Sequence, residues 1–290
     1  MQFNLLQCQS GRDVSANLQF IETQLKQLPR KPDEAQFVVL PEACLLFGGH
    51  ESEQIKWAGK IVNHGHDIEH ISELKSHLAK LAAKFNVYLV AGTIPALASD
   101  GRIYSRSYLF SSKGDLVGQY DKLHLFDVNI QDETQHYRES DTFCPGNNIS
   151  VFNTPFGRIG LAICYDLRFA DLFRALRLAE ADIIVIPSAF TSVTGKAHWQ
   201  TLVQARAIDS QCFILAANQW GSHNQGSRET WGHSMIVDPW GRIISQRQQG
   251  VGWVQGSLNF EDMHQIRQAM PIKSHNRFAK PNLQMHNLNT

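Results

Sequence analysis

Short apolar segments, rich in β-branched residues, alternate with longer amphipathic segments from one end of the chain to the other. The short segments predict β-strands, and the longer ones, with apolar residues on one face, predict α-helices. We expect strands at residues 3–7, 37–40, 87–91, 103–110, 159–163, 183–186, 213–217 and 235–237, and helices at residues 14–28, 68–85, 171–179 and 196–210. This alternation is typical of an α/β protein.

Turn signals join some of the predicted strands directly, which a purely parallel sheet would not show. Residues 111–115 (SSKGD), 154–157 (TPFG) and 238–241 (DPWG) each separate two apolar segments. Two mixed sheets packed face to face, with helices outside, accommodate both kinds of connection. Because no linker composition divides the chain, we expect one domain over residues 1–290, with an extended tail from about residue 271. Residues 127–148 lack periodicity and are expected to form a functional loop.

Composition narrows the range of partners and compartments. The 27 basic and 27 acidic residues balance and form no basic run, which excludes the usual electrostatic signature of nucleic-acid or anionic-membrane binding. A small-molecule partner is expected instead. The chain has no signal-peptide pattern and no run near the roughly 18 apolar residues of a membrane span, which predicts a cytoplasmic protein. Its five scattered cysteines contain no CxxC pair, which argues against a disulfide framework or a cysteine-bound zinc.

Three predicted strands lead into a reactive or charged residue. Glu42 follows residues 37–40 as a partly desolvated carboxylate suited to moving a proton, and Lys122 follows residues 116–120 as a cation able to stabilise an oxyanion. Cys164 follows residues 159–163 and precedes a helix, whose N-terminus would lower the pKa of the thiol. Taken singly, each residue has a plainer interpretation, as a loop glutamate, a surface lysine or an inert buried cysteine.

The phrases around these residues, taken together, resemble the nitrilase superfamily of carbon-nitrogen hydrolases. They are LPE with Glu42, YDKLHLFD with Lys122 and GLAICYDLRF with Cys164, and the resemblance spans nearly the whole chain. It implies a four-layer α-β-β-α sandwich with two mixed β-sheets, and a catalytic triad formed by these three residues. A second family glutamate, which positions the lysine and the substrate, corresponds to Glu139 in RESDTFCPG.

Within the superfamily, the chain is similar to the Nit branch, and most of all to its deaminated glutathione amidases. The phrases that carry this similarity are KLHLFDV, PSAFTSVTGKAHW, ARAIDSQCF and WGHSMIVDPWG. The resemblance implies a metabolite-repair reaction, hydrolysis of N-(4-oxoglutaryl)-cysteinylglycine (deaminated glutathione) to 2-oxoglutarate and cysteinylglycine. The omega-amidases, which release ammonia from 2-oxoglutaramate, remain an alternative. Residues 129–138 depart from the shorter loop of many relatives, so the resemblance defines substrate preference least.

The residue types indicate a mechanism through a thioester. Glu42 would take the proton of Cys164, and the thiolate would add to the amide carbonyl. Lys122 and the backbone N-H of Tyr165 would hold the resulting oxyanion. Glu42 would then protonate the leaving amine and activate the water that hydrolyses the thioester.

A substrate with carboxylates requires a cation and polar groups near the nucleophile. Arg168 is the nearest arginine to Cys164 in the sequence, although Asp166 could pair with it instead. The segment after the strand at 183–186 supplies further candidates for substrate binding, together with Tyr165: Ser188, Phe190, Thr191 and Thr194.

Three other interpretations stay open. His64, His66 and His70 could form a metal site, but the cluster precedes an expected surface helix and no HExxH motif is present. We therefore expect neither a metal nor another cofactor. A nitrile hydrolase is the rival enzyme, and a non-catalytic sandwich that binds a partner is the rival of a different class.

Apolar residues on more than one face of residues 168–178 and 196–202 exceed what one core is expected to bury. Members of the resembled family pair through the corresponding helices. We therefore expect a homodimer, or a higher even-numbered oligomer.

Overall fold

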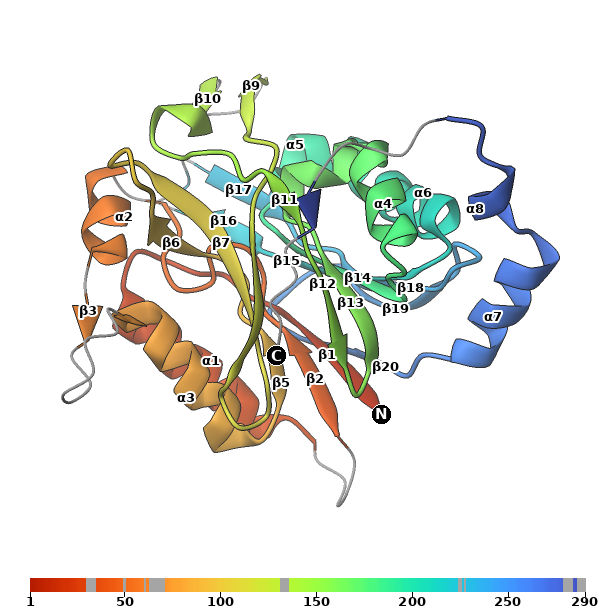
Figure 1. The fold of residues 1–290 in the computed structure, drawn as a ribbon. Helices are drawn as coiled ribbons and strands as arrows, with labels where there is room; N and C mark the ends of the chain where they lie inside the picture. Colours follow the sequence, from red (N-terminus) through yellow and green to blue (C-terminus); the bar gives the residue numbers. More distant parts are fainter. Residues whose placement is uncertain are drawn as a thin grey trace.

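Two large β-sheets lie face to face in the molecule, and helices cover their outer faces (Figure 1). The computed structural model describes residues 1–29, 35–48, 51–59, 61–62, 71–130, 136–223, 226, 228–278 and 284–285. The first sheet contains, in spatial order, β20 (Gly252–Gly256), β1 (Gln2–Gln7), β2 (Gln36–Val39), β5 (Tyr88–Val90), β7 (Ile103–Phe110) and β6 (Ile94–Leu97), with β8 (Leu116–Asp121) also paired to β7. The second contains β12 (Val151–Thr154), β13 (Gly157–Leu161), β14 (Ile183–Ser188), β15 (Phe213–Asn218), β18 (Ser234–Val237) and β19 (Ile243–Arg247).

The remaining elements form the outer layers and the connections. The helices are α1 (Val14–Gln27), α2 (Glu51–Ala58), α3 (Glu73–Phe85), η1 (Glu139–Asp141), η2 (Cys164–Arg168), α4 (Ala170–Leu178), α5 (Ser192–Thr194), η3 (Gly195–Trp199), α6 (Gln200–Ser210), α7 (Phe260–Ala269) and α8 (Ile272–His275). Four short ladders pair β3 (Ile61–Val62) with β4 (Ile71–Ser72), β9 (Asp127–Asn129) with β10 (His136–Arg138), β11 (Asn148–Ile149) with β21 (Gln284–Met285), and β16 (Trp220–His223) with β17 (Arg228–Trp231).

The alternation of side chains along β2 shows how the layers form. Phe37 and Val39 belong to the apolar cluster shared with the second sheet, whereas Val38 and Leu40 belong to the cluster shared with α1 and α3. Successive residues of a strand point to opposite faces, so a strand that is apolar at every position is covered on both sides. The second sheet is covered in the same way by α4 and α6. The expected four-layer sandwich with two mixed sheets is therefore confirmed.

The three turn signals connect antiparallel neighbours, as expected. Residues 111–115 join β7 to β8, residues 154–157 join β12 to β13, and residues 238–241 join β18 to β19. The other pairs include parallel neighbours such as β1 with β2 and β13 with β14. Hairpins and helical crossovers thus coexist in each sheet.

Three expectations about element bounds are wrong. Within the described residues, the helix expected from residue 68 begins at Glu73 and follows the short strand β4. Residues 127–148 contain the β9–β10 hairpin and η1, because strands of three residues are too short to show a period. The tail expected to be extended from about residue 271 includes the helix α8.

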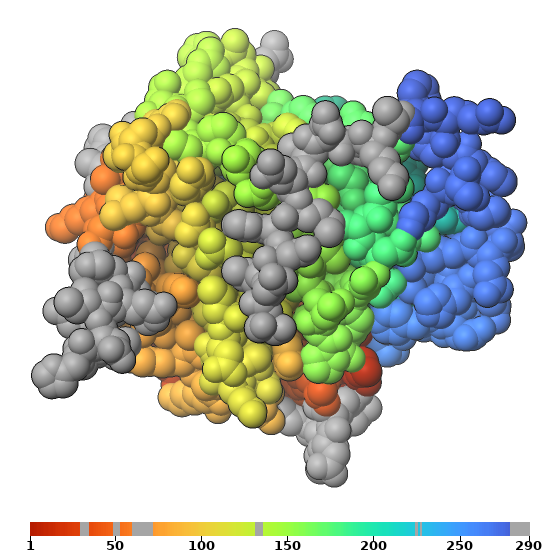
Figure 2. Space-filling view, viewed as in Figure 1, coloured from red at the N-terminus to blue at the C-terminus, as the bar shows by residue number. Residues whose placement is uncertain are grey.

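The C-terminal helices lie against the side of the second sheet. Figure 2 shows α7 and α8 (blue) on the flank opposite to α2 (orange). Phe260 of α7 packs its ring against Phe213 with centroids 5.6 Å apart, and Arg267 pairs with Asp182 at 2.9 Å. Among the described residues, no helix is long and apolar enough to cross a membrane.

Candidate active site

The ends of three strands meet at one cavity. β2 and β8 run in the same direction within the first sheet, since β5 is parallel to β2 and antiparallel to β7, and β7 is antiparallel to β8. Their carboxyl ends therefore lie at one edge of the sheet, followed by Glu42 and Lys122. Cys164 follows β13, a strand of the second sheet. All three residues line a cavity of about 940 Å³.

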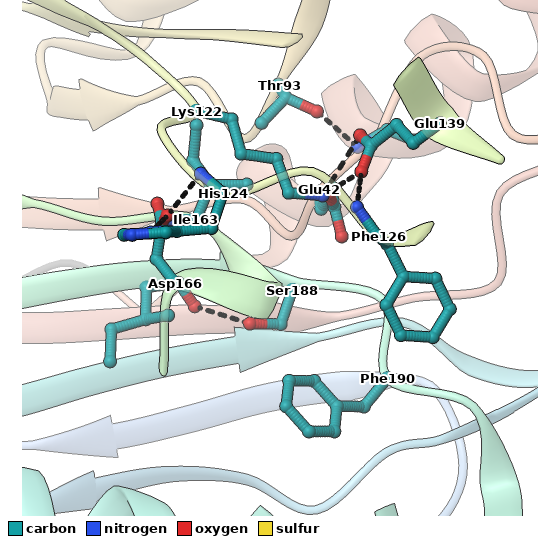
Figure 3. Close-up of polar contacts among 12 residues, drawn as sticks. Glu42, Thr93, Lys122, His124, Phe126, Glu139, Ile163, Asp166, Ser188 and Phe190 are labelled. Atoms are coloured by element: carbon teal, nitrogen blue, oxygen red, sulfur yellow. Dashed lines mark hydrogen bonds and ion pairs between the residues drawn. The ribbon is translucent and has the colours of Figure 1, made fainter. Parts of the chain in front are cut away.

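Lys122 lies between two carboxylates in this cavity. Its Nζ donates to Glu42 Oε1 at 3.0 Å and to both carboxylate oxygens of Glu139 at 2.9 and 3.0 Å. Figure 3 shows the three side chains pointing toward one another. The lysine side chain is 2% exposed, compared with 11% for Glu42 and 16% for Glu139, so these charges interact largely out of water.

Mutual pairing determines the ionisation of this cluster. Burial alone would lower the pKa of Lys122, but the carboxylates of Glu139 and Glu42 hold it well above its usual value. Burial and the charge of Glu42 raise the pKa of Glu139, while Lys122 acts in the opposite direction. The lysine is therefore a permanent cation at neutral pH, able to stabilise negative charge on a nearby atom.

Cys164 occupies a strained elbow between β13 and η2. Its φ is 45°, in the left-handed region that favours glycine. Burial and the nearby Glu42 raise the pKa of its thiol well above the usual value, although Lys122 and a hydrogen bond from the Ala189 backbone lower it. The expected lowering by a helix N-terminus is therefore wrong. The five-residue 3-10 helix η2 begins at the cysteine itself, and the α-helix α4 begins only at Ala170.

Asp166 connects the lysine strand to the cysteine elbow. Its side chain accepts hydrogen bonds from the hydroxyl of Tyr120 at 2.7 Å and from the backbone N-H of His124 at 3.0 Å, and its Oδ1 lies 2.7 Å from Nδ1 of His124. It also accepts from the Ile163 backbone at 2.9 Å, next to the cysteine (Figure 3). Its partners Tyr120 and His124 lie two residues before and two residues after Lys122. Asp166 therefore fixes the distance between the segment that contains Lys122 and the segment that contains Cys164.

Separate contacts hold the backbone around Glu42. The side-chain amide of Gln219 donates to the Glu42 carbonyl at 3.0 Å, and the Thr93 hydroxyl accepts from the backbone of Ala43 at 2.9 Å. Gly92 lies so close that a Cβ there would be 2.1 Å from the Pro41 carbonyl oxygen. These contacts bring together segments far apart in the chain.

The glutamate on the other side of Lys122 is held through the backbone. Phe126 donates its N-H to Glu139 Oε2 at 2.7 Å, and Gly146 donates to the Lys122 carbonyl at 2.8 Å. A Cβ on Gly146 would lie 2.3 Å from the Asp121 carbonyl oxygen, so only glycine allows this approach. The PG phrase is visible in the sequence, but its contact with the lysine strand is not.

Comparison with known proteins agrees with this arrangement. The carbon-nitrogen hydrolase domain matches residues 4–268. The chain belongs to the carbon-nitrogen hydrolase family. It is 43% identical to the deaminated glutathione amidase of Yersinia enterocolitica over 277 residues, which are 95% of this chain and 92% of that protein.

A second relative is similar to this chain in both sequence and structure. The omega-amidase NIT3 of Saccharomyces cerevisiae is 33% identical over 270 residues, which are 93% of this chain and 90% of that protein. The crystal structure of Saccharomyces cerevisiae Nit3, described as a member of branch 10 of the nitrilase superfamily, superposes with a TM-score of 0.80 at 33% identity, covering 96% of this chain and 97% of that one. Membership of this family implies a small-molecule amide as substrate.

Most of the residues expected to bind substrate line the cavity of this carbon-nitrogen hydrolase. They are Tyr165, Arg168, Phe190, Thr191 and Thr194. The Thr191 hydroxyl lies 2.9 Å from that of Thr194 and accepts from its N-H at 3.3 Å, so Thr191 also caps the N-terminus of α5.

Ser188 is the exception among the expected binding residues. It is the last residue of β14, is fully buried and does not line the cavity. Its hydroxyl donates to the Ile186 carbonyl at 3.3 Å. The expectation that it anchors substrate is wrong, because the strand continues two residues beyond the predicted end and keeps this side chain inside.

Arg168 does not pair with Asp166, whose carboxylate oxygens accept hydrogen bonds from Tyr120, His124 and Ile163. Its guanidinium lies 5.6 Å from the ring centre of Tyr165 and 5.4 Å from that of Phe190, and 3.2 Å from Nδ1 of His198. No carboxylate among the described residues pairs with it. The arginine is thus available to an anionic ligand.

The cavity contains further cations that the sequence had not indicated, namely Arg12, Arg138 and Arg228. In contrast, the described ranges contain no group of three or more His, Cys, Asp or Glu side chains placed to hold a metal ion. His64, His66 and His70 lie outside the described residues. The five cysteines are all free thiols.

Proposed function

We propose that this chain is an amidase that hydrolyses deaminated glutathione to 2-oxoglutarate and cysteinylglycine, with Cys164 as the covalent nucleophile. The observation that carries the proposal is the ammonium of Lys122, held within 3.0 Å of Glu42 and Glu139 in the cavity that also contains Cys164. The name of the relative with 43% identity supports the choice of substrate.

The first step moves the proton of Cys164 to Glu42. Because burial keeps the thiol protonated at rest, the thiolate forms as the carboxylate accepts its proton and the sulfur attacks the amide carbon. The carbonyl oxygen gains negative charge, which Lys122 and the backbone N-H of Tyr165 stabilise. Glu139 keeps the lysine charged and oriented throughout.

Breaking the C-N bond requires a proton on the leaving nitrogen. Protonated Glu42 supplies it, cysteinylglycine leaves, and a 2-oxoglutaryl thioester remains on Cys164. Glu42, again a carboxylate, then takes a proton from water as the oxygen adds to the thioester carbon. Collapse of this second intermediate releases 2-oxoglutarate and returns the proton to the thiolate, so the enzyme is regenerated.

The charge of the cavity supports a substrate with more than one carboxylate. Arg168 suits the carboxylate of the 2-oxoglutaryl half, because a guanidinium can donate two parallel hydrogen bonds to it. Phe190 and the hydroxyl groups of Thr191 and Thr194 complete that side. Glutathione itself carries an α-ammonium in place of the keto oxygen, which would be repelled by the arginine.

The proposal is tested by comparing kcat/KM for four compounds. We expect deaminated glutathione to exceed 2-oxoglutaramate, and both to exceed glutathione and an aliphatic nitrile. A preference for 2-oxoglutaramate would place the enzyme with the omega-amidases, and a preference for the nitrile would make it a nitrilase. Absence of turnover with all four compounds would favour the alternative of a non-catalytic sandwich that binds a partner.

We also propose a dimer that forms through residues other than those expected from the sequence. Leu172 and Trp199 are 2% and 0% exposed within the chain, so one core does bury them, contrary to the expectation from the sequence. Exposed apolar side chains instead occur on α6 and at the β18–β19 turn, where Ile208 is 50% and Trp240 56% exposed. Analytical ultracentrifugation is expected to give twice the chain mass, and Ile208→Asp to shift it toward the monomer.

A further inference from the structure

Arg228 is one of the cations that line the cavity. It begins β17 and is partly buried, yet no Asp or Glu among the described residues pairs with it. Its Nε is shielded from solvent and makes no hydrogen bond within the described part of the chain. A guanidinium that lines the cavity and has no acid partner among the described residues is suited to pairing with a bound anion.

Two aromatic rings hold this guanidinium in place. It lies 4.7 Å from the ring centre of Phe47 and 5.4 Å from that of Tyr137. Phe47 also contacts His223, with ring centroids 4.1 Å apart, and His223 is the partner of Arg228 in the β16–β17 ladder. An arginine stacked in this way loses little conformational entropy when it binds a carboxylate.

His223 itself is a structural member of this stack. Its ring nitrogens lie 2.9 Å from the Ser10 carbonyl oxygen and 2.8 Å from the Thr230 hydroxyl. Burial, with a contribution from Arg228, lowers the pKa of His223 to about 4. The ring is therefore neutral at pH 7, and the positive charge of the stack belongs to Arg228.

The other cations of the cavity differ from Arg228 in their surroundings. Arg138 is exposed and donates to the Tyr137 carbonyl at 3.0 Å and to Asn129 at 3.4 Å. Arg12 is exposed and lies on no aromatic ring among the described residues. Lys122 already forms ion pairs with Glu42 and Glu139. Arg228 and Arg168 are thus the cavity cations that contact aromatic rings and that pair with no acid in the described part of the chain.

These two arginines contact opposite ends of a row of rings. Arg168 lies over Tyr165, whose centroid is 5.1 Å from that of Phe126, and Phe126 is 5.0 Å from Tyr137, which contacts Arg228. Phe47, the other ring against Arg228, belongs to the segment that directly follows Glu42. Glu42 protonates the leaving amine in the proposed reaction, and Arg228 contacts the segment that follows Glu42. Arg228 therefore lies on the side of the cavity that holds the leaving group.

We propose that Arg228 determines substrate specificity by binding the terminal carboxylate of the leaving amine, while Arg168 binds the carboxylate of the acyl half. This inference rests on the proposed function, because it assigns the second carboxylate of a peptide-like substrate. A peptide-like substrate in an extended conformation is a little longer than three residues. Its two carboxylates are then roughly 12 Å apart. An amide whose leaving group is ammonia does not use this site.

The test compares deaminated glutathione with its C-terminal carboxamide, which lacks only the second carboxylate. The ratio of kcat/KM for the acid to that for the amide is measured in the wild type, Arg228→Gln and Arg12→Gln. We expect the wild type to favour the acid by about 10- to 100-fold, as for a hydrogen-bonded charge pair. In Arg228→Gln the ratio falls to within about threefold of one, whereas Arg12→Gln, which removes a cavity charge without a ring contact, keeps the wild-type ratio.

Turnover of 2-oxoglutaramate reports whether the variant is folded, and Arg228→Gln is expected to retain it. Arg228→Lys is a second variant, which keeps the charge without the planar fork and is expected to retain a reduced preference for the acid. An unchanged ratio in Arg228→Gln, or a ratio lost in Arg12→Gln instead, would overturn the inference. If the wild type hydrolyses 2-oxoglutaramate but neither form of deaminated glutathione, the proposed substrate is wrong and the inference falls with it.

Discussion

The ammonium of Lys122 lies between two carboxylates, whereas the guanidinium of Arg228 lies between two aromatic rings and has no acid partner among the described residues. Both cations line the same cavity. The lysine is almost completely buried, so its charge requires compensation within the protein. The arginine is held by the faces of rings, which orient the group without satisfying its donors.

This difference separates the parts of the site that act on the reacting bond from those that select the substrate. A charge already paired can stabilise a transition state without reorganisation, because its direction is fixed before the substrate arrives. A charge left without an acid partner gains its partner only from a ligand. Substitutions on the paired side should therefore reduce turnover with every substrate, and those on the arginine side should depend on which substrate is used.

The largest effect is expected from Cys164→Ala. Turnover of every substrate should fall by about a thousandfold or more, because no other group can form the thioester. The melting temperature should be unchanged or slightly higher, since alanine also removes a buried thiol beside a carboxylate. Cys144→Ala is the control, because that thiol contacts Asp100 rather than Lys122. Substantial turnover in Cys164→Ala would contradict covalent catalysis.

Lys122→Met should lower both turnover and stability. Two carboxylates would then face each other without a cation, and breaking a buried pair of this kind costs about 3–5 kcal/mol. Urea unfolding measures the loss. Adding Glu139→Gln to this variant should restore part of the stability but none of the turnover. A single variant as stable as the wild type would show that the cluster is not electrostatically coupled.

Glu42→Gln should lower kcat by about 10²- to 10⁴-fold, as expected when a general acid-base group is lost. The Michaelis constants for deaminated glutathione and 2-oxoglutaramate should change much less, because the group acts on protons that move during the reaction. Steady-state kinetics with both substrates provides the measurement. A raised Michaelis constant with a normal kcat would instead assign Glu42 to substrate binding.

Arg168→Lys should raise the Michaelis constant for deaminated glutathione and for 2-oxoglutaramate alike, by about tenfold, because both contain the acyl carboxylate. Arg228→Lys should affect the first substrate only. The comparison of these two variants distinguishes the ends of the cavity without changing net charge. Equal effects of both variants on both substrates would remove the distinction.

The smallest effect concerns a buried thiol away from the lysine. Burial raises the pKa of Cys8 from 9.0 to about 12, despite hydrogen bonds with Ser10 and Gln219 that lower it. The folded state thus holds this proton more tightly than the unfolded state, so its contribution to stability is complete below pH 9 and is lost as the pH rises toward 12. Cys8→Ala should flatten this decline by about 1.4 kcal/mol per pH unit, measured by urea unfolding. A decline as steep as in the wild type would contradict the assigned burial.

The sequence predicts the strands that lead to Glu42, Lys122 and Cys164, because each is a continuous apolar run and buried runs have few alternatives. It does not predict what aligns them. Asp166 reaches Tyr120 across 46 positions, and Gln219 reaches Glu42 across 177, so these contacts depend on how the two sheets are packed. A local pattern contains no information about such distances.

Errors about individual side chains have the same origin. Ser188 was expected at the cavity because an apolar run ends near it, but pairing with Asn218 extends β14 through this residue. Arg228 was missed because its significance lies in two rings from distant segments. The pKa of Cys164 was expected to be lowered because a following helix is visible in the sequence, whereas burial between the sheets is not.

The central claim is that the paired lysine and glutamates serve covalent chemistry at Cys164, and the direct measurement is mass spectrometry of the protein quenched in acid during turnover of deaminated glutathione. The account predicts a fraction of protein heavier by one 2-oxoglutaryl group, located on the peptide that contains Cys164. Steady product formation with no acyl group on any peptide, or an acyl group on a different residue, would contradict it.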